Sequence, residues 1–311
     1  MERVCIVGGG VIGSLFAAHL SRVSDVWLLC RRREHAASVR ANGLRVSGRG
    51  EFVARLQATC DPGELPAVDL ALLATKATDV EAAALQLELF LRQGSVMTVQ
   101  NGLGAEATVR RHGPWPVISA VTFMSGTKHA DDHVEYVLDT PTWLGPFEGA
   151  PFELVEQAAA LIVSAGLKAE ALPDLRPAQW SKLIFNATVN GVAALTGLPH
   201  DFHFAALERP FDLGHLVRAL VGEGKAVAAA AGVELRDDPW QMNVLATRRG
   251  SAHFPSMLED VRERRRTEVD LINGSLVREA RRQGIEVPLH EAVYALVRGR
   301  ERSYAPEPVP A

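Results

Sequence analysis

The sequence predicts an α/β fold class, with a Rossmann-type domain first and an all-helical C-terminal domain after it. Three observations support this prediction. Short apolar runs alternate with helical patterns in the first half, a glycine-rich motif follows the first apolar run, and only helical periodicity is found beyond residue 177. Because 311 residues exceed the usual size of one hydrophobic core, we expect two domains, at residues 1–172 and 173–311.

The first domain is expected to contain a parallel sheet with a hairpin added to it. Apolar runs bounded by turn residues predict strands at residues 3–7, 25–30, 70–74, 95–99 and 117–121. Residues 134–138 and 142–144, separated by Asp139, Thr140 and Pro141, predict a hairpin that extends this sheet. A helix at residues 151–165 and a strand at residues 168–171 complete the domain.

The second domain begins after a linker that Pro173, Asp174 and Pro177 mark by interrupting the pattern. Helical periodicity then predicts helices at residues 178–195, 210–231, 239–249, 262–283 and 289–302. Residues 305–311 contain three prolines, which is typical of an extended, frayed tail.

Composition excludes several classes of function. A formal net charge of −4 provides no general positive field, so we expect no nucleic-acid partner. The three cysteines, Cys5, Cys30 and Cys60, do not have metal-ligand spacing, which predicts reduced thiols and no metal site. No apolar run reaches the ~18 to 20 residues of a membrane span, and no signal peptide is evident. We expect a cytoplasmic protein without a membrane partner; a homodimer is an open alternative to a monomer.

The glycine-rich motif after the first predicted strand has the spacing of a dinucleotide-binding loop. Its glycines are Gly8, Gly10 and Gly13, and the loop also contains Gly9, Val11 and Ile12. The first glycine permits a tight turn, the second lets the backbone approach a pyrophosphate, and the third lets the following helix pack on the strand. The N-terminus of that helix then faces the phosphates. The alternative is a glycine-rich turn with a purely steric role.

The end of the second predicted strand indicates which dinucleotide binds. A site for NAD usually has a carboxylate there to hold the ribose hydroxyls, whereas this chain has Arg31 and Arg32. A guanidinium can neutralise a 2′-phosphate and donate two parallel hydrogen bonds to it. The sequence therefore predicts NADP(H) as the cofactor, with Arg31 and Arg32 as contacts. The alternative is that these arginines only begin the next helix.

Three polar residues recur at helical spacing just after the linker. Lys182, Asn186 and Asn190 are four residues apart and therefore lie on one stripe of a helix. A lysine can donate a proton to an alkoxide that develops at a ketone, and neutral amides can orient the carbonyl. The stripe is thus a candidate site for ketone reduction. The alternative is a solvated helix face.

The same helix resembles the catalytic helix of the ketopantoate reductase family, and three further motifs match that family in the same order. The matching residues are Lys76 with Asn101, Gly102, Leu103 and Gly104; Trp180, Ser181, Lys182, Leu183, Asn186 and Asn190; Ser256, Met257, Leu258 and Asp260; and Arg266, Thr267, Glu268, Val269, Asp270, Ile272, Asn273 and Gly274. The resemblance spans nearly the whole chain. It implies a Rossmann-type domain, a helical domain and hydride transfer from NADPH to the 2-keto carbon of ketopantoate.

The resemblance also implies roles for single residues. Lys182 is expected to be the general acid, and Glu268 to contact the substrate hydroxyl or hold Lys182. Asn101, Asn186, Asn190 and Ser256 are expected to bind the 2-keto acid. Lys76 and Asn101 are expected to lie near the nicotinamide. The alternatives are a surface acid on a helix for Glu268, an N-cap for Ser256 and a turn residue for Asn101.

The chain departs from the family pattern at His200 and at residues 122–127. Because a pocket that hydrogen-bonds its ligand is sensitive to every polar partner, these changes bear on the choice of substrate more than on the chemistry. The main alternative is therefore an NADPH-dependent reductase of another 2-keto acid. A second alternative, from a different class, is a protein that senses NADP without catalysis.

Overall fold

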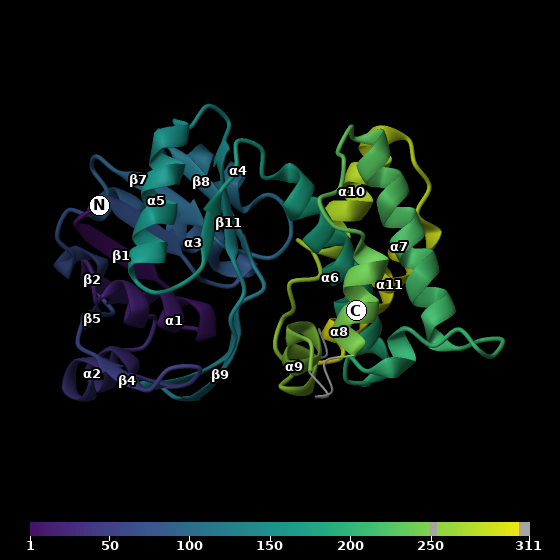
Figure 1. Ribbon diagram of the computed structural model, residues 1–311, viewed down its shortest axis with the longest axis horizontal. Helices are drawn as coiled ribbons and strands as arrows, with labels where there is room; N and C mark the ends of the chain where they lie inside the picture. The colour runs from purple at the N-terminus through teal and green to yellow at the C-terminus, as the bar shows by residue number, and fades with distance from the viewer. Residues whose placement is uncertain (249–253, 305–311) are drawn as a thin grey trace, which may run out of the picture. The chain divides into compact units, whose positions relative to one another are not determined.

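The computed structural model describes residues 1–248 and 254–304 and consists of two compact units (Figure 1). The first unit contains residues 1–100 and 105–175. The second contains residues 101–104 together with the chain from Arg176 onward. Residues 101–104 therefore pack with the second unit, although they follow a strand of the first. The predicted tail at residues 305–311 and the predicted helix end at Arg249 lie outside the described residues.

The main sheet of the first unit has eight strands in the order β12-β11-β8-β7-β6-β1-β2-β5. All neighbours are parallel except β8 and β11. The strands are β1 (Arg3–Val7), β2 (Asp25–Leu29), β5 (Gln57–Thr59), β6 (Leu70–Leu73), β7 (Ser95–Thr98), β8 (Val117–Thr122), β11 (Thr142–Phe147) and β12 (Ala169–Ala171). The predicted parallel sheet is confirmed, because its apolar runs are buried on both faces.

Helices cover both faces of this sheet. They are α1 (Val11–Leu20), α2 (Arg33–Asn42), α3 (Val80–Ala84), α4 (Ala105–His112) and α5 (Phe152–Ser164), with short 3₁₀ turns η1 (Pro62–Glu64), η2 (Ala77–Asp79) and η3 (Leu87–Leu89). Alternate residues of β1 enter two separate cores: Val4 and Ile6 pack with α1 and α5, whereas Cys5 and Val7 pack with α3 and α4. Because these strands are parallel and packed on both faces, their carboxyl ends lie along the same edge of the sheet.

A second, four-stranded sheet corrects the predicted hairpin. Its order is β4-β3-β10-β9, with β3 (Leu44–Gly48), β4 (Phe52–Ala54), β9 (Ser125–Ala130) and β10 (His133–Leu138). The two strands of the predicted hairpin do not pair: β10 pairs with β9 and β3, and β11 pairs with β8 in the main sheet. The sequence did not indicate β9, because this strand is polar and mostly half-exposed or exposed.

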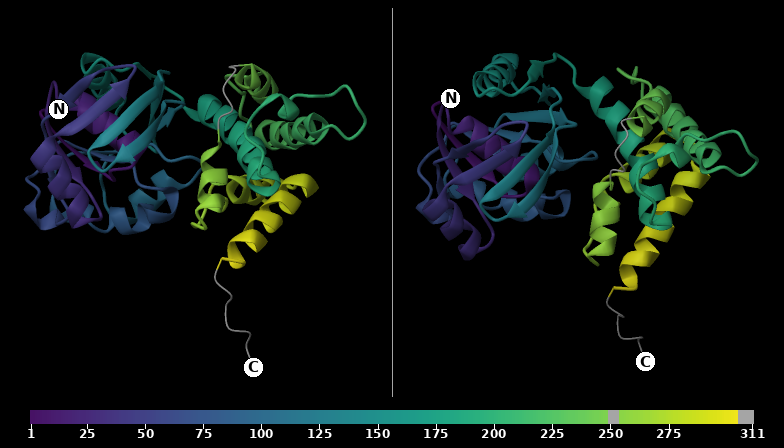
Figure 2. Two further views of the ribbon diagram at one scale, coloured as in Figure 1. Left: turned by 90° about the horizontal axis from the view of Figure 1, so that it is seen from below. Right: turned by 60° about the horizontal axis from the view of Figure 1, so that its bottom comes forward.

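The regular elements of the second unit, in the part of it that the structure describes, are all helices, as predicted. Its helices are α6 (Arg176–Thr196), α7 (Leu213–Ala230), α8 (Pro239–Thr247), α9 (Ser256–Arg262), α10 (Asn273–Gln283) and α11 (Pro288–Arg302), with the 3₁₀ turn η4 (Phe202–Phe204). Helix α6 packs against each of the other α-helices, and both views of Figure 2 show the yellow α11 beside the teal α6. In the described ranges, no helix is long and apolar enough to span a bilayer.

The predicted helix at residues 262–283 is wrong in its first half. Residues 263–272, which we call the turn segment, separate α9 from α10 and are not helical. Arg264 has a φ of 53°, a left-handed conformation that ends α9. The backbone N–H and the hydroxyl of Thr267 both donate to Glu301 Oε1 at 2.7 Å. These side-chain bonds replace helical hydrogen bonds, and the pattern of apolar residues alone did not indicate them.

Candidate functional site

The glycine-rich loop joins β1 to α1 in a shape that needs glycine at two positions. Gly8 has a φ of +106°, and a Cβ there would lie 2.9 Å from the Ala74 carbonyl carbon and the Thr75 nitrogen. A Cβ on Gly13 would lie 1.9 Å from the Gly8 carbonyl oxygen. These contacts pack the loop between β6 and α1, as the three-glycine spacing predicts.

The N-terminus of α1 has the features of an anion site. The N-cap residue is Gly10, which has no side chain to cap the helix. No capping side chain therefore accepts hydrogen bonds from the N–H groups of the first turn, which begins with Val11 and Ile12. A Cβ on Gly10 would meet no atom within 4 Å, and this residue is exposed. The loop thus leaves open space in front of a helix N-terminus. This arrangement fits the pyrophosphate of a dinucleotide.

Polar groups gather at the carboxyl ends of β6 and β7, beside this loop. Lys76 follows β6 and is half-buried. Gln100 follows β7, and its amide nitrogen donates to the carbonyl oxygens of Leu73 at 2.8 Å and Thr75 at 3.1 Å. No sequence pattern indicated Gln100, although it directly precedes Asn101. In the part of the chain that the structure describes, the Gln100 Oε1 and Thr75 Oγ1 atoms are buried without a hydrogen-bond partner.

Arg31 and Arg32 lie at the end of β2, as predicted, and Arg32 is also the N-cap residue of α2. The Arg31 side chain is 86% exposed, and its Nη1 lies 3.4 Å from Asp79 Oδ2. Arg32 forms an ion pair with Asp131 from the turn between β9 and β10. Each guanidinium therefore has a carboxylate partner from a distant part of the sequence, which spacing alone did not indicate.

In the second unit, α6 carries the predicted polar stripe. Asn186 and Asn190 are 9% and 5% exposed, and Lys182 is half-buried, so the alternative of a solvated helix face is wrong. Asn186 Nδ2 donates to Asn101 Oδ1 at 3.4 Å, and Asn101 Nδ2 donates to Glu268 Oε2 at 3.3 Å. The structure therefore links the two amides to the Glu268 carboxylate.

The environment of Lys182 changes its acidity. Removal from water disfavours the charged ammonium and lowers the pKa of Lys182 to about 8, and the Glu268 carboxylate partly opposes this effect. An amine with this pKa is still mostly protonated at neutral pH. It gives up its proton more readily than a solvated lysine, which is what a general acid requires.

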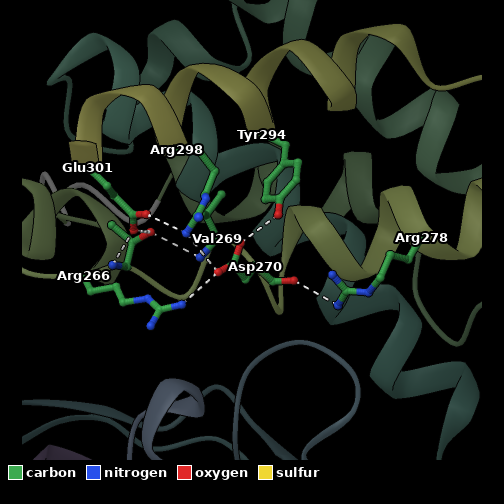
Figure 3. A network of polar contacts seen from close by, with 8 residues as sticks. Arg266, Val269, Asp270, Arg278, Tyr294, Arg298 and Glu301 are labelled. Atoms are coloured by element: carbon green, nitrogen blue, oxygen red, sulfur yellow. Dashed lines mark hydrogen bonds and ion pairs between the residues drawn. The ribbon is translucent and has the colours of Figure 1, made fainter. Parts of the chain in front are cut away.

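Glu268 belongs to the turn segment, so the alternative of an acid on a helix surface is wrong; its side chain is buried. Figure 3 shows the contacts that hold this segment. The Asp270 carboxylate accepts hydrogen bonds from Tyr294 Oη at 2.7 Å, Arg298 Nη1 at 3.1 Å and Arg266 Nη2 at 3.2 Å. The Asp270 carbonyl oxygen accepts a hydrogen bond from Arg278 Nη2 at 3.0 Å. With the Thr267–Glu301 bonds, these contacts attach both sides of Glu268 to α10 and α11.

Asn101 is held against the turn segment by the residues that follow it. The Leu103 N–H donates to the Leu271 carbonyl oxygen at 3.1 Å. Gly102 has a φ of +94°, and a Cβ there would lie 1.9 Å from the same oxygen. Only glycine permits this approach. Asn101 is therefore more than a turn residue, because its loop brings an amide to Glu268.

The remaining predicted residues, Ser256 and Lys76, belong to different units. Ser256 is exposed at the first residue of α9, and Pro255 is the N-cap, so the alternative of a Ser256 cap is wrong. Helix α9 packs against α6, which carries Asn190. Lys76 belongs to the first unit, whereas Asn101 packs with the second.

His200, where the chain departs from the family pattern, is buried. Its Nε2 lies 2.8 Å from Asn243 Oδ1, and its ring contacts Phe185 and Phe204 edge-on. In residues 122–127, the Met124 N–H donates to Thr122 Oγ1 at 3.0 Å where β8 leads into β9. No cluster of three His, Cys, Asp or Glu side chains suited to a metal ion occurs in residues 1–248 and 254–304.

Comparison with known proteins gives matches over both units. A family model described as ketopantoate reductase PanE/ApbA matches residues 4–149, and one for its C-terminal part matches residues 174–301. A protein named 2-dehydropantoate 2-reductase from Archaeoglobus fulgidus is 30% identical over 302 residues, covering 97% of this chain and 98% of that protein.

Solved structures show the same similarity. A PanE/ApbA family ketopantoate reductase from Ralstonia eutropha JMP134 has a TM-score of 0.87 and 28% identity, with 97% of this chain and 99% of that chain covered. A D-mandelate dehydrogenase with NADH and anilino(oxo)acetate has a TM-score of 0.86 and 23% identity, covering 97% of this chain and 99% of that chain. At that identity the likeness concerns the fold.

Proposed function

The chain belongs to the ketopantoate reductase family of oxidoreductases, and we propose that it reduces 2-dehydropantoate to pantoate with NADPH and with Lys182 as the general acid. The observation that carries this proposal is the buried Glu268 carboxylate beside the polar stripe of α6, on which Lys182 and Asn186 lie, with the pKa of Lys182 lowered to about 8 in support. The Asn101 and Asn186 amides join that carboxylate in one hydrogen-bonded chain. A titratable cation next to oriented amides is what the reduction of a ketone needs.

The residues of the second unit have different roles in the proposed reaction. As the 2-keto carbon is reduced, the carbonyl oxygen becomes an alkoxide, and the Lys182 ammonium donates a proton to it. The amides of Asn186 and Asn190 and the Ser256 hydroxyl bind and orient the keto acid. Glu268 accepts a hydrogen bond from the substrate hydroxyl or holds Lys182, and its charge keeps that amine protonated up to a higher pH than burial alone would.

The first unit provides the place for the dinucleotide, which supplies the hydride when bound. The open space at Gly10 and the N-terminus of α1 fit its pyrophosphate. Gly8, Gly9 and Gly13 shape the loop. The family resemblance assigns the nicotinamide end to Lys76 and Asn101. Arg31 and Arg32 would bind the 2′-phosphate.

The direct test of this function is a steady-state assay of 2-dehydropantoate against other branched 2-keto acids, with NADPH as the reductant. The proposal expects the highest kcat/KM with 2-dehydropantoate. A higher kcat/KM with another keto acid would show that this keto acid is the substrate and would leave the proposed reaction type unchanged. Binding of NADPH without turnover of any keto acid would contradict the enzymatic proposal and support a sensing protein.

The cofactor assignment predicts that Arg31→Ala and Arg32→Ala weaken NADPH binding far more than NADH binding. A hydrogen bond to a charged group contributes about 1.5 to 3 kcal/mol, which corresponds to about a 10- to 100-fold increase in the dissociation constant for NADPH. Titration of each dinucleotide, followed by nicotinamide fluorescence, measures this difference. Arg33→Ala is the matched control, because Arg33 is the adjacent exposed arginine at the first residue of α2. Equal losses for the two cofactors would refute the assignment.

A further inference from the structure

The two-residue turn between β9 and β10 brings a carboxylate to the predicted 2′-phosphate site. The turn consists of Asp131 and Asp132, and Asp131 forms an ion pair with Arg32. The Asp131 Oδ1 atom also lies 3.8 Å from His35 Nδ1. The sequence has no acid at the end of β2, but the fold supplies one from about 100 residues further along the chain.

A second cation connects this turn to the glycine-rich loop. Lys128 of β9 donates to the Gly9 carbonyl oxygen and lies 3.4 Å from Ser14 Oγ and 3.1 Å from His35 Nε2. A Cβ on Gly9 would lie 2.4 Å from His35 Cε1, so the imidazole packs directly against the loop. His35 therefore lies between the Asp131 carboxylate and the Lys128 ammonium.

Asp131 forms an ion pair with Arg32, and its charge also acts on the Lys128 ammonium. Burial lowers the pKa of His35, and the Lys128 charge lowers it further, so the imidazole is neutral at physiological pH. Lys128 makes its hydrogen bonds to a carbonyl, a hydroxyl and an imidazole. The direct ionic partner of Asp131 is thus the guanidinium that the proposed function assigns to the 2′-phosphate.

We propose that Asp131 is a specificity-determining residue, which competes with the 2′-phosphate for Arg32 and so limits the preference for NADPH over NADH. This inference rests on the proposed function, because it takes Arg32 as a 2′-phosphate contact. A phosphate that approaches Arg32 must displace or share the carboxylate and is repelled by its charge. A ribose 2′-hydroxyl is neutral and can donate a hydrogen bond to the same carboxylate.

The exposure of the pair sets the size of the effect. The side chains of Arg32 and Asp131 are 56% and 27% exposed. Pairs with such access to solvent are weak, because water screens them. We therefore expect Asp131 to change the ratio of the two dissociation constants by about 3- to 10-fold rather than to decide which cofactor binds.

Asp131→Asn tests this, with Asp132→Asn as the matched control. Asp132 is the other acid of the same turn and accepts a hydrogen bond from Asn42 Nδ2 at 2.6 Å rather than pairing with an arginine. Dissociation constants for NADPH and NADH are measured by fluorescence titration of the full chain, without any keto acid. Asp131→Asn should tighten NADPH binding about 3- to 10-fold without tightening NADH. Asp132→Asn should change both cofactors by the same small factor.

A double variant shows whether Arg32 carries the effect. In an Arg32→Ala background, Asp131→Asn should change NADPH binding much less than in the wild-type chain. The reason is that the guanidinium for which Asp131 and the 2′-phosphate compete is then absent. Weaker NADPH binding in Asp131→Asn would overturn the inference, because the carboxylate would then hold Arg32 in place for the phosphate. Equal effects of the two Asn variants would overturn it as well.

The titrations also separate this inference from the proposed function. If the wild-type chain binds NADPH and reduces a keto acid while Asp131→Asn leaves the cofactor ratio unchanged, only the role of Asp131 fails. If the wild-type chain binds no NADPH, the proposed function and this inference both fail.

Discussion

Lys182→Ala is expected to lower kcat for keto acid reduction by about 10²- to 10⁴-fold, the usual contribution of one positioned acid. The methyl group of alanine cannot donate a proton to the alkoxide, whereas the glycine-rich loop and the arginines of the first unit are unchanged. NADPH affinity should therefore remain close to that of the wild-type chain. Steady-state kinetics and fluorescence titration of NADPH measure the two quantities.

Lys225→Ala is the matched control for this variant. Lys225 belongs to the same helical unit but is exposed on α7, and its Nζ lies 2.7 Å from Asp238 Oδ2. Its removal should leave kcat unchanged. If Lys182→Ala kept the wild-type kcat, or if both variants lost activity equally, Lys182 would not be the acid.

Gly102→Ala is expected to have the second largest effect. Its Cβ would overlap the Leu271 carbonyl oxygen, at 1.9 Å, on a backbone with a φ of +94°. The loop must then move away from the turn segment, which displaces Asn101 from Glu268. A shift of about 1 Å at a positioning residue can lower kcat/KM by about 10²-fold. The strain should also lower the free energy of unfolding by about 1 to 3 kcal/mol, measurable by denaturant titration.

Gly104→Ala separates the displaced contact from backbone strain alone. Gly104 also has a positive φ, +107°, but a Cβ there would be 4.0 Å from the nearest atom, Leu271 Cδ2. This variant should lower the free energy of unfolding and leave kcat/KM within a few-fold of wild type. Equal losses of kcat/KM in the two variants would show that the Leu271 contact does not position Asn101.

The parts of the fold that the sequence predicts are those with local signals. The strands of the parallel sheet are continuous apolar runs, and the glycine-rich loop has a fixed spacing next to one of them. The second sheet has no such signal. It joins β3 to β10, about 90 residues apart, and its strand β9 is polar, so the pairing depends on tertiary contacts that no local pattern records.

The candidate site was predictable to a similar extent. The spacing of Lys182, Asn186 and Asn190 placed them on one helix, and the structure confirms that stripe. The helical period also continues through residues 263–272, but side-chain bonds to Asp270 and Glu301 hold that segment in a turn. Lys128 and Asp131 were not predicted, because only the second sheet brings them to the glycine-rich loop and Arg32.

The dependence of kcat/KM on pH tests the role of Lys182 most directly. The ammonium is the proton donor, so raising the pH through its pKa of about 8 removes the active form of the free enzyme. For keto acid reduction, kcat/KM of the wild-type chain should be constant below that pKa and fall about tenfold per pH unit above it. In Lys182→Gln the residual kcat/KM should no longer show this decrease. A decrease that persists at the same pH in Lys182→Gln would contradict the assignment of Lys182 as the acid.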